Sequence, residues 1–289
     1  MIKFGVAGNS NKFFEEGYTS TIQAAEWCAV RGIDIFEYSF GRGVTLPAAT
    51  ATAIGQKFAE FGVELTVHAP YFINFANPDP SMIEKSIGYV TQSIRKCEQF
   101  GGTRVVVHPA SQGKMTREEA FALTKQNFVA LANRLKEQGY EDRFMICIET
   151  MGKLGQIGTV DEVIELCGLS ECFYPCIDFG HINAREQGIL KYAENYNTII
   201  LKMLDKLPYK KVENMHIHFS KIAYGPKGEL NHLTFEDTKY GPDFTPLAEV
   251  LAGYGFSPYI VCESDGTQAD DAIEMKRIYN EILAKKAKV

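Results

Sequence analysis

The sequence predicts an α/β protein that folds as a single-domain (β/α)8 barrel, the TIM-barrel architecture. Three observations lead to this prediction. Eight short apolar segments recur along the chain, helical patterns separate them, and the chain of 289 residues exceeds the about 250 residues that such a barrel commonly needs. We expect one domain over residues 1–289, because no linker, low-complexity tract or internal repeat divides the sequence.

The apolar segments are near-continuous hydrophobic runs, as expected for strands that are buried on both faces of a parallel sheet. They span residues 3–8, 34–38, 65–70, 104–109, 145–151, 174–181, 214–221 and 258–264. Strict alternation of such strands with helices favours the closed barrel. A doubly wound open sheet is the alternative, but no G-x-G-x-x-G pattern follows the first segment.

Helices are predicted from apolar residues at helical spacing and from capping residues. Pro80 opens the third helix, and Thr116 and Thr159 each begin a capping box completed by a Glu three residues later. The remaining helices are predicted over 19–31, 48–61, 189–207, 245–253 and 269–284. The longest predicted loop, 222–243, follows the seventh strand, and loops of that length are usually functional or mobile.

Composition restricts the class of protein. Hydrophobic residues make up 45% and charged residues 23% of the chain, which is ordinary for a soluble globular protein. No apolar run is long enough to span a membrane, and the N-terminus reads as a first strand rather than a signal peptide. The odd number of seven cysteines, with no CxxC, indicates reduced thiols. We therefore expect a cytoplasmic protein, and a monomer.

The net charge of −6 argues against a generally basic nucleic-acid binder. It leaves nucleic acid open as a partner, because a local basic rim or bound metal ions can supply positive potential within an acidic protein.

Metal-ligand residues stand at the ends of the apolar segments. Of six histidines, all but His232 fall in or just after such a segment. Because the carboxyl ends of barrel strands meet on one face, we expect these residues to converge there. The candidate ligands are His68, His108, Glu149, Asp178, His181, His216, His232 and Glu263.

This set exceeds what one ion requires, since a catalytic zinc takes about three protein ligands. Eight ligands fit two or three ions, especially if Glu149 bridges two of them. Paired metal ions about 4 Å apart suit the hydrolysis of phosphate esters. His218 points to the same side of its strand as His216. It remains open whether His218 is a ligand, a phosphate contact or a partner of another ligand.

From His68-Ala-Pro-Tyr71-Phe-Ile-Asn74 onward, the sequence resembles the endonuclease IV family. These are zinc-dependent apurinic/apyrimidinic endonucleases of the xylose-isomerase-like barrel superfamily. Further matching motifs are Val107-His108-Pro109, Ile148-Glu149-Thr150-Met151, Cys176-Ile-Asp178 with His181, His216 with Ser220-Lys221, and Glu263.

The resemblance implies a trinuclear zinc site. His68 and His108 would hold the first ion, and His181 and His232 the third. Asp178, His216 and Glu263 would hold the second, with Glu149 bridging the first two. The family hydrolyses DNA on the 5′ side of an abasic site by a metal-bound hydroxide and leaves a 3′-hydroxyl. Tyr71 and Asn74 match positions that the family uses beside the damaged nucleotide.

The sequence departs from the family in three places. After His216 the family has an Asn-Asp pair where this chain has His218-Phe219. The family has an Asp two residues before the histidine that matches His232, where this chain has Leu230. Glu229 or His218 are the candidate replacements. The first two loops also differ, and Arg42 or Phe40 would take the role of the residues that the family inserts into DNA.

Two other functions compete. A sugar isomerase or epimerase of the same superfamily would use one divalent ion held by Glu149, Asp178, His216 and Glu263, and the two glutamates would transfer protons. A non-catalytic barrel is the third alternative. In both enzyme hypotheses Glu149 and Glu263 serve catalysis. Zn²⁺ is the expected metal, with Mn²⁺ as the alternative, because mixed His and carboxylate ligands suit several ions.

Overall fold

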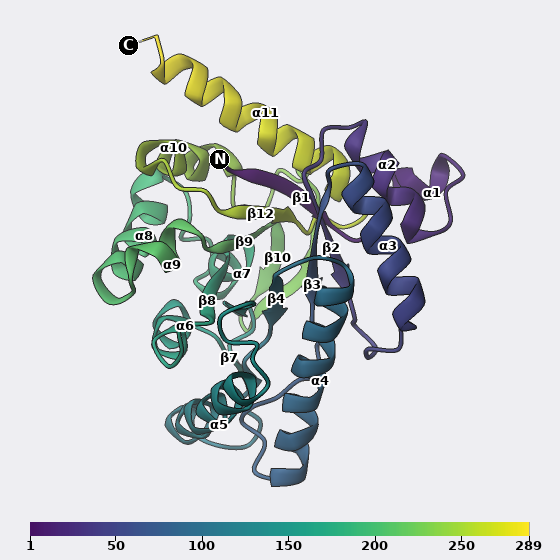
Figure 1. The fold of residues 1–289 in the computed structure, drawn as a ribbon. Coiled ribbons are helices and arrows are strands. Elements are labelled where there is room, and N and C mark those ends of the chain that lie inside the picture. Colours follow the sequence, from purple (N-terminus) through teal and green to yellow (C-terminus); the bar gives the residue numbers. More distant parts are fainter. Residues whose placement is uncertain (289) are drawn as a thin grey trace.

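The computed structural model describes residues 1–288 and confirms the closed parallel barrel (Figure 1). The strands lie around the barrel in the order β1 (Lys3–Ala7), β12 (Tyr259–Cys262), β9 (His216–Phe219), β8 (Phe173–Asp178), β6 (Met145–Glu149), β4 (Arg104–Val107), β3 (Glu64–His68) and β2 (Ile35–Ser39). β1 pairs in parallel with both β2 and β12, which closes the sheet. All eight predicted strands are therefore present.

Helices surround the barrel, because every strand is followed by a segment that returns outside the sheet. They are α1 (Asn11–Glu15), α2 (Ala24–Ala29), α3 (Ala48–Glu60), α4 (Pro80–Gln99), α5 (Arg117–Glu137), α6 (Val160–Cys167), α7 (Phe179–Arg185), α8 (Ala193–Lys206), α9 (Tyr209–Glu213), α10 (Phe244–Tyr254) and α11 (Gln268–Lys286). A short 3-10 turn, Thr21–Gln23, precedes α2. Both predicted capping boxes are present, at Thr116 and Thr159.

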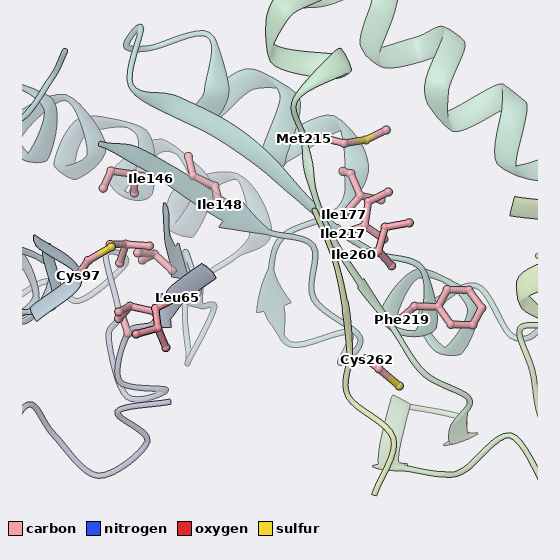
Figure 2. Packing of buried hydrophobic residues seen from close by; sticks show 14 of the residues in the cluster. Leu65, Cys97, Ile146, Ile148, Ile177, Met215, Ile217, Phe219, Ile260 and Cys262 are labelled. Carbon is pink, nitrogen blue, oxygen red and sulfur yellow. The ribbon is translucent and has the colours of Figure 1, made fainter. Parts of the chain in front are cut away.

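Strand side chains alternate between the helices and the barrel interior. Figure 2 shows outward-facing residues of this kind, among them Ile146, Ile177 and Ile217, in the main hydrophobic cluster. All seven cysteines are buried and free. Most of the buried histidines and carboxylates face inward from the barrel strands, namely Glu37, His68, Glu149, Asp178, His216 and His218.

Two differences from the sequence-based expectation concern predicted ligand residues. The predicted strand 174–181 ends at Asp178, whose side chain accepts a hydrogen bond from the backbone N–H of His181 and so caps α7. Aspartate at this position starts a helix, and His181 therefore lies on the first turn of α7. The predicted loop 222–243 contains a hairpin, β10 (Ile222–Gly225) and β11 (Gly228–His232).

Candidate metal centre

The carboxyl ends of six consecutive barrel strands bring their ligand residues to one site. His68, Glu149 and Asp178 are the last residues of β3, β6 and β8, and His108 and Glu263 follow β4 and β12 directly. Four sets of potential ligands have their donor atoms within 4.8 Å of one another. Three of these sets meet at the strand ends, and together they contain nine residues: His68, His108, Glu149, Asp178, His181, His218, Glu229, His232 and Glu263.

The first group consists of His68, His108 and Glu149, the set that the family resemblance implies. Oε2 of Glu149 lies 3.2 Å from Nε2 of His68 and 2.9 Å from Nε2 of His108. The other ring nitrogen of His68, Nδ1, lies 2.8 Å from the carbonyl oxygen of Ala69. A carbonyl oxygen can only accept a hydrogen bond, so Nδ1 carries the ring proton and Nε2 is left as the ligand atom.

The second group contains Glu149, Asp178, Glu263 and His218. Nδ1 of His218 lies 3.2 Å from Oε1 of Glu149 and 3.5 Å from Oε1 of Glu263. The two oxygens of Glu149 therefore face different groups, which is the arrangement that a bridging carboxylate needs. His218 takes the place in this group that the sequence assigned to His216.

The assignment of His216 to the second ion is thus corrected. His216 and His218 point to the same side of β9, but His216 is two residues farther from the carboxyl end. Its Nε2 lies 3.1 Å from Oε2 of Glu37, and its other close neighbours are Cys176 and His218. His216 therefore belongs to a deeper level of the barrel interior than Asp178 and Glu263.

The third group consists of His181, Glu229 and His232. Nε2 of His181 lies 3.5 Å from Oε2 of Glu229. Nδ1 of His181 lies 2.9 Å from the carbonyl oxygen of Thr150, and Nδ1 of His232 lies 2.8 Å from the hydroxyl of Ser220. In both rings these contacts leave Nε2 available for an ion.

A β-bulge explains how Glu229 replaces the missing Asp at Leu230. Ala223 pairs with Asn231 and Tyr224 pairs with Glu229, so Leu230 is the extra residue of β11. An extra residue reverses the alternation of side chains. Glu229 and His232, three positions apart, therefore face the same side, while Leu230 is 62% exposed.

The hairpin that carries Glu229 is fixed against the segment after β6. The N–H of Glu229 donates to the carbonyl oxygen of Gly152, and Leu154 donates to Lys227. A Cβ atom at Gly228 would lie 2.2 Å from the Gly152 oxygen, and the positive φ of Gly228 is one that other residues rarely adopt. Glycine at 228 therefore permits the close approach that places Glu229.

The pKa values in the site reflect many opposed charges in a small volume. Burial raises the pKa of Glu149, but His108 and His218 outweigh burial and hold it well below its ordinary value. Burial lowers the pKa of His181, but Asp178, Glu149 and Glu229 raise it well above normal. Burial raises the pKa of Glu263.

These residues fit divalent cations. Asp178 is completely buried, and its Oδ2 accepts no hydrogen bond from any of residues 1–288. Four carboxylates and five histidines face a common centre, and buried carboxylates without compensating charge are costly. Mixed nitrogen and oxygen ligands suit Zn²⁺ and several other divalent ions.

Sequence reasoning missed Glu37, a buried residue of β2 that is 1% exposed. Oε1 of Glu37 lies 2.9 Å from Nε2 of His218, and the Thr66 hydroxyl donates to Oε2 over 2.9 Å. The signal was available, because Glu37 is the one charged residue within the apolar run Ile35-Phe-Glu-Tyr38.

The predicted substrate-contacting residues differ in their surroundings. The Tyr71 ring is 53% exposed and lies with its centroid 4.9 Å from that of His68, and its hydroxyl is 2.8 Å from Oγ of Ser39. Asn74 uses its side-chain oxygen to accept from the N–H groups of Ala76 and Ser111, so it joins two loops.

Of the two candidates for insertion into DNA, Arg42 is exposed in the loop after β2. Phe40 is only 4% exposed and packs against Tyr38 and Phe100. The alternative that Phe40 serves as a wedge is therefore wrong, because its ring belongs to the hydrophobic core.

The fold and the ligand groups define a barrel with a candidate metal centre at the carboxyl ends of its strands. The family model described as "xylose isomerase-like TIM barrel" matches residues 24–280. The chain belongs to this family. Among the described residues, no helix combines the length and apolar character that crossing a bilayer requires.

Two curated relatives illustrate the range of similarity. An uncharacterized protein of Methanocaldococcus jannaschii is 28% identical over 98% of both chains. A probable endonuclease 4 of Mycoplasma genitalium is 29% identical over 56% of this chain and 54% of that protein. The alignment to the named endonuclease thus spans about half of each protein.

Solved structures confirm the fold at low sequence identity. A D-tagatose 3-epimerase-like protein has a TM-score of 0.69 at 18% identity and covers 99% of this chain and 100% of its own. Endonuclease IV from Thermus thermophilus has a TM-score of 0.68 at 16% identity and covers 98% of this chain and 99% of its own. The barrel is therefore shared by endonucleases and by sugar epimerases.

Proposed function

We propose that the protein is a metal-dependent phosphodiester hydrolase that cleaves DNA on the 5′ side of abasic sites. The observation that carries this proposal is the set of three ligand groups around one centre, each with at least three donor residues. Bound divalent ions would activate water for attack and neutralise charge on the phosphate and the leaving oxygen.

The protein's own residues have separate parts in this reaction. His68, His108 and Glu149 would hold one ion, Glu149 with Asp178, His218 and Glu263 a second, and His181, Glu229 and His232 a third. Glu149 would be shared by the first two ions, because its two oxygens face both groups. The half-exposed Tyr71 ring beside His68 offers a surface for stacking or for a hydrogen bond to phosphate.

The experiment is an incision assay on a duplex that contains one abasic site, with protein reconstituted with Zn²⁺ or Mn²⁺. The expected product has a 3′-hydroxyl end on the 5′ side of the lesion. The same duplex with an intact base is the control for general nuclease activity. Intact DNA after incubation with protein of full metal content would contradict the proposal.

The alternative is a divalent-metal sugar isomerase or epimerase, and one observation favours it. Glu149, Asp178, His218 and Glu263 form a complete four-residue group of two Glu, one Asp and one His. In this reaction Glu149 and Glu263 would move protons beside a carbonyl group. The alternative gives no joint purpose to His181, Glu229 and His232. Conversion of ketoses by protein that holds one ion per chain would support it.

A further inference from the structure

Glu37 is a buried carboxylate that lies outside the three ligand groups at the strand ends. It points into the barrel from β2, one level below the metal centre, and it is 1% exposed. Removing a carboxylate from water is costly unless nearby groups compensate for its lost hydration. The Thr66 hydroxyl donates to Oε2 over 2.9 Å, but one neutral donor is a small compensation for a full charge.

Two histidines of β9 supply the remaining contacts. Oε1 of Glu37 lies 2.9 Å from Nε2 of His218, and Oε2 lies 3.1 Å from Nε2 of His216. Both distances are short enough for a hydrogen bond, but neither ring is aligned for an N–H···O bond to Glu37 in the structure, so the contacts are close approaches of a carboxylate and an imidazole. Both histidines are completely buried, so no solvent competes for these contacts.

The His218 ring connects the two levels of the barrel interior. Its Nε2 faces Glu37 below, while its Nδ1 faces Glu149 and Glu263 in the second ligand group above. A neutral imidazole carries one proton, and the stronger acceptor decides which nitrogen holds it. A carboxylate beside Nε2 attracts the proton there and leaves the lone pair on Nδ1. The opposite tautomer would direct a lone pair at the negative charge of Glu37.

We propose that Glu37 is a positioning residue of the metal centre, which accepts the Nε2 proton of His218 and thereby presents Nδ1 to the second ion. Histidine ligands usually donate their second N–H to a carboxylate or a carbonyl group, which fixes the ring and increases its basicity. His68 and His181 use backbone carbonyl oxygens for this purpose. His218 is buried among inward-facing side chains, and Glu37 provides its acceptor. This inference rests on the proposed metal centre.

The proposal is tested by zinc titration of the metal-free full-length protein, with bound metal counted per chain at fixed free zinc concentrations. In Glu37→Gln, we expect the affinity of one ion to fall about 10- to 100-fold, the usual effect of losing such a partner. Thr66→Val removes only the donor that orients Glu37, so its effect should have the same direction and be smaller. Glu162→Gln is the matched control, because Glu162 is buried and paired with Arg117 but lies outside the ligand groups.

Nitrogen-15 NMR of the histidine rings in the zinc-loaded protein gives a second, independent readout. The wild type should show His218 with its proton on Nε2, and Glu37→Gln should weaken or redistribute that signal. Zinc binding and a His218 tautomer unchanged in both Glu37→Gln and Thr66→Val would overturn the role of Glu37 and leave the proposed hydrolase intact. A wild-type protein that binds no zinc, manganese or other divalent ion would overturn both.

Discussion

The two inward-facing histidines of β9 differ in what surrounds them, although they share one strand and one side of it. His218 lies at the upper level with Glu149, Asp178 and Glu263, whereas His216 lies at the lower level with Glu37 and Cys176. Strand residues rise roughly 3.3 Å each, so the two side chains are separated by about 6–7 Å along the strand. Metal–ligand bonds are about 2 Å long, so a given ion at the strand ends is within reach of His218 alone.

Alternation along a strand therefore predicts the side to which a residue points but not its depth in the barrel. Burial lowers the pKa of His216 to about 4, so its ring is neutral at pH 7 and packs as a polar interior residue. Burial also lowers the pKa of His218, but the carboxylates of Glu263, Glu37 and Glu149 outweigh burial and raise it well above its ordinary value. The same residue type therefore serves different purposes at the two levels.

The largest effect is expected from Glu149→Gln, which alters the residue shared by the first and second ligand groups. The substitution keeps the shape of the side chain but removes its charge. Metal ions contribute several kcal/mol to such reactions, so hydrolysis should fall about a thousandfold or more. Circular dichroism should show an unchanged fold. Retained activity would mean that Glu149 does not bridge the two groups.

The difference between His216 and His218 is tested by replacing each of them with Asn in turn. His218→Asn should lose one bound ion per chain and most activity, because a ligand of the second group is gone. His216→Asn should retain the full metal count, because that residue lies below the site. Elemental analysis of both purified variants measures this directly. Loss of an ion from His216→Asn alone would restore the assignment made from the sequence.

Two substitutions in β11 test the third ligand group and the β-bulge that positions it. Glu229→Gln should remove the third ion and leave the other two, because the first two groups do not include Glu229. Adding Leu230→Asp to Glu229→Gln should not restore the ion, because the bulge directs residue 230 toward solvent. Metal counts after dialysis against the same free zinc concentration compare the two variants. Restoration by Asp at 230 would show that the hairpin has a different register.

The smallest effect is expected at Tyr71, which lies beside His68 but belongs to none of the ligand groups. Tyr71→Phe keeps the ring beside His68 but loses the hydroxyl, which contacts Ser39 in the structure and would donate a hydrogen bond to the substrate phosphate. One hydrogen bond contributes about 1 kcal/mol, so KM for the substrate should rise about fivefold with an unchanged metal count. A change in metal count in this variant would show that Tyr71 supports the ligands rather than the substrate.

The sequence predicts much of the barrel because hydrophobic runs and capping residues are local signals. Eight strands follow from the alternation of apolar and helical segments, and the candidate ligands His68, His108, Glu149, Asp178 and Glu263 follow from the rule that strand ends converge. Glu37 escaped attention because it lies within a strand rather than at its end, and its partners come from β9 and β3. Glu229 could be named only as an alternative, because a bulge in a long-range pairing decides which way it faces.

The proposed metal centre is tested most directly by the number of metal ions per chain, measured by elemental analysis of protein purified without chelators. Three ions per chain are expected, one in each of the first, second and third ligand groups. A count of three in the wild type and two in Glu229→Gln would support it. A single ion, held by Glu149, Asp178, His218 and Glu263, would contradict the account and favour the sugar isomerase.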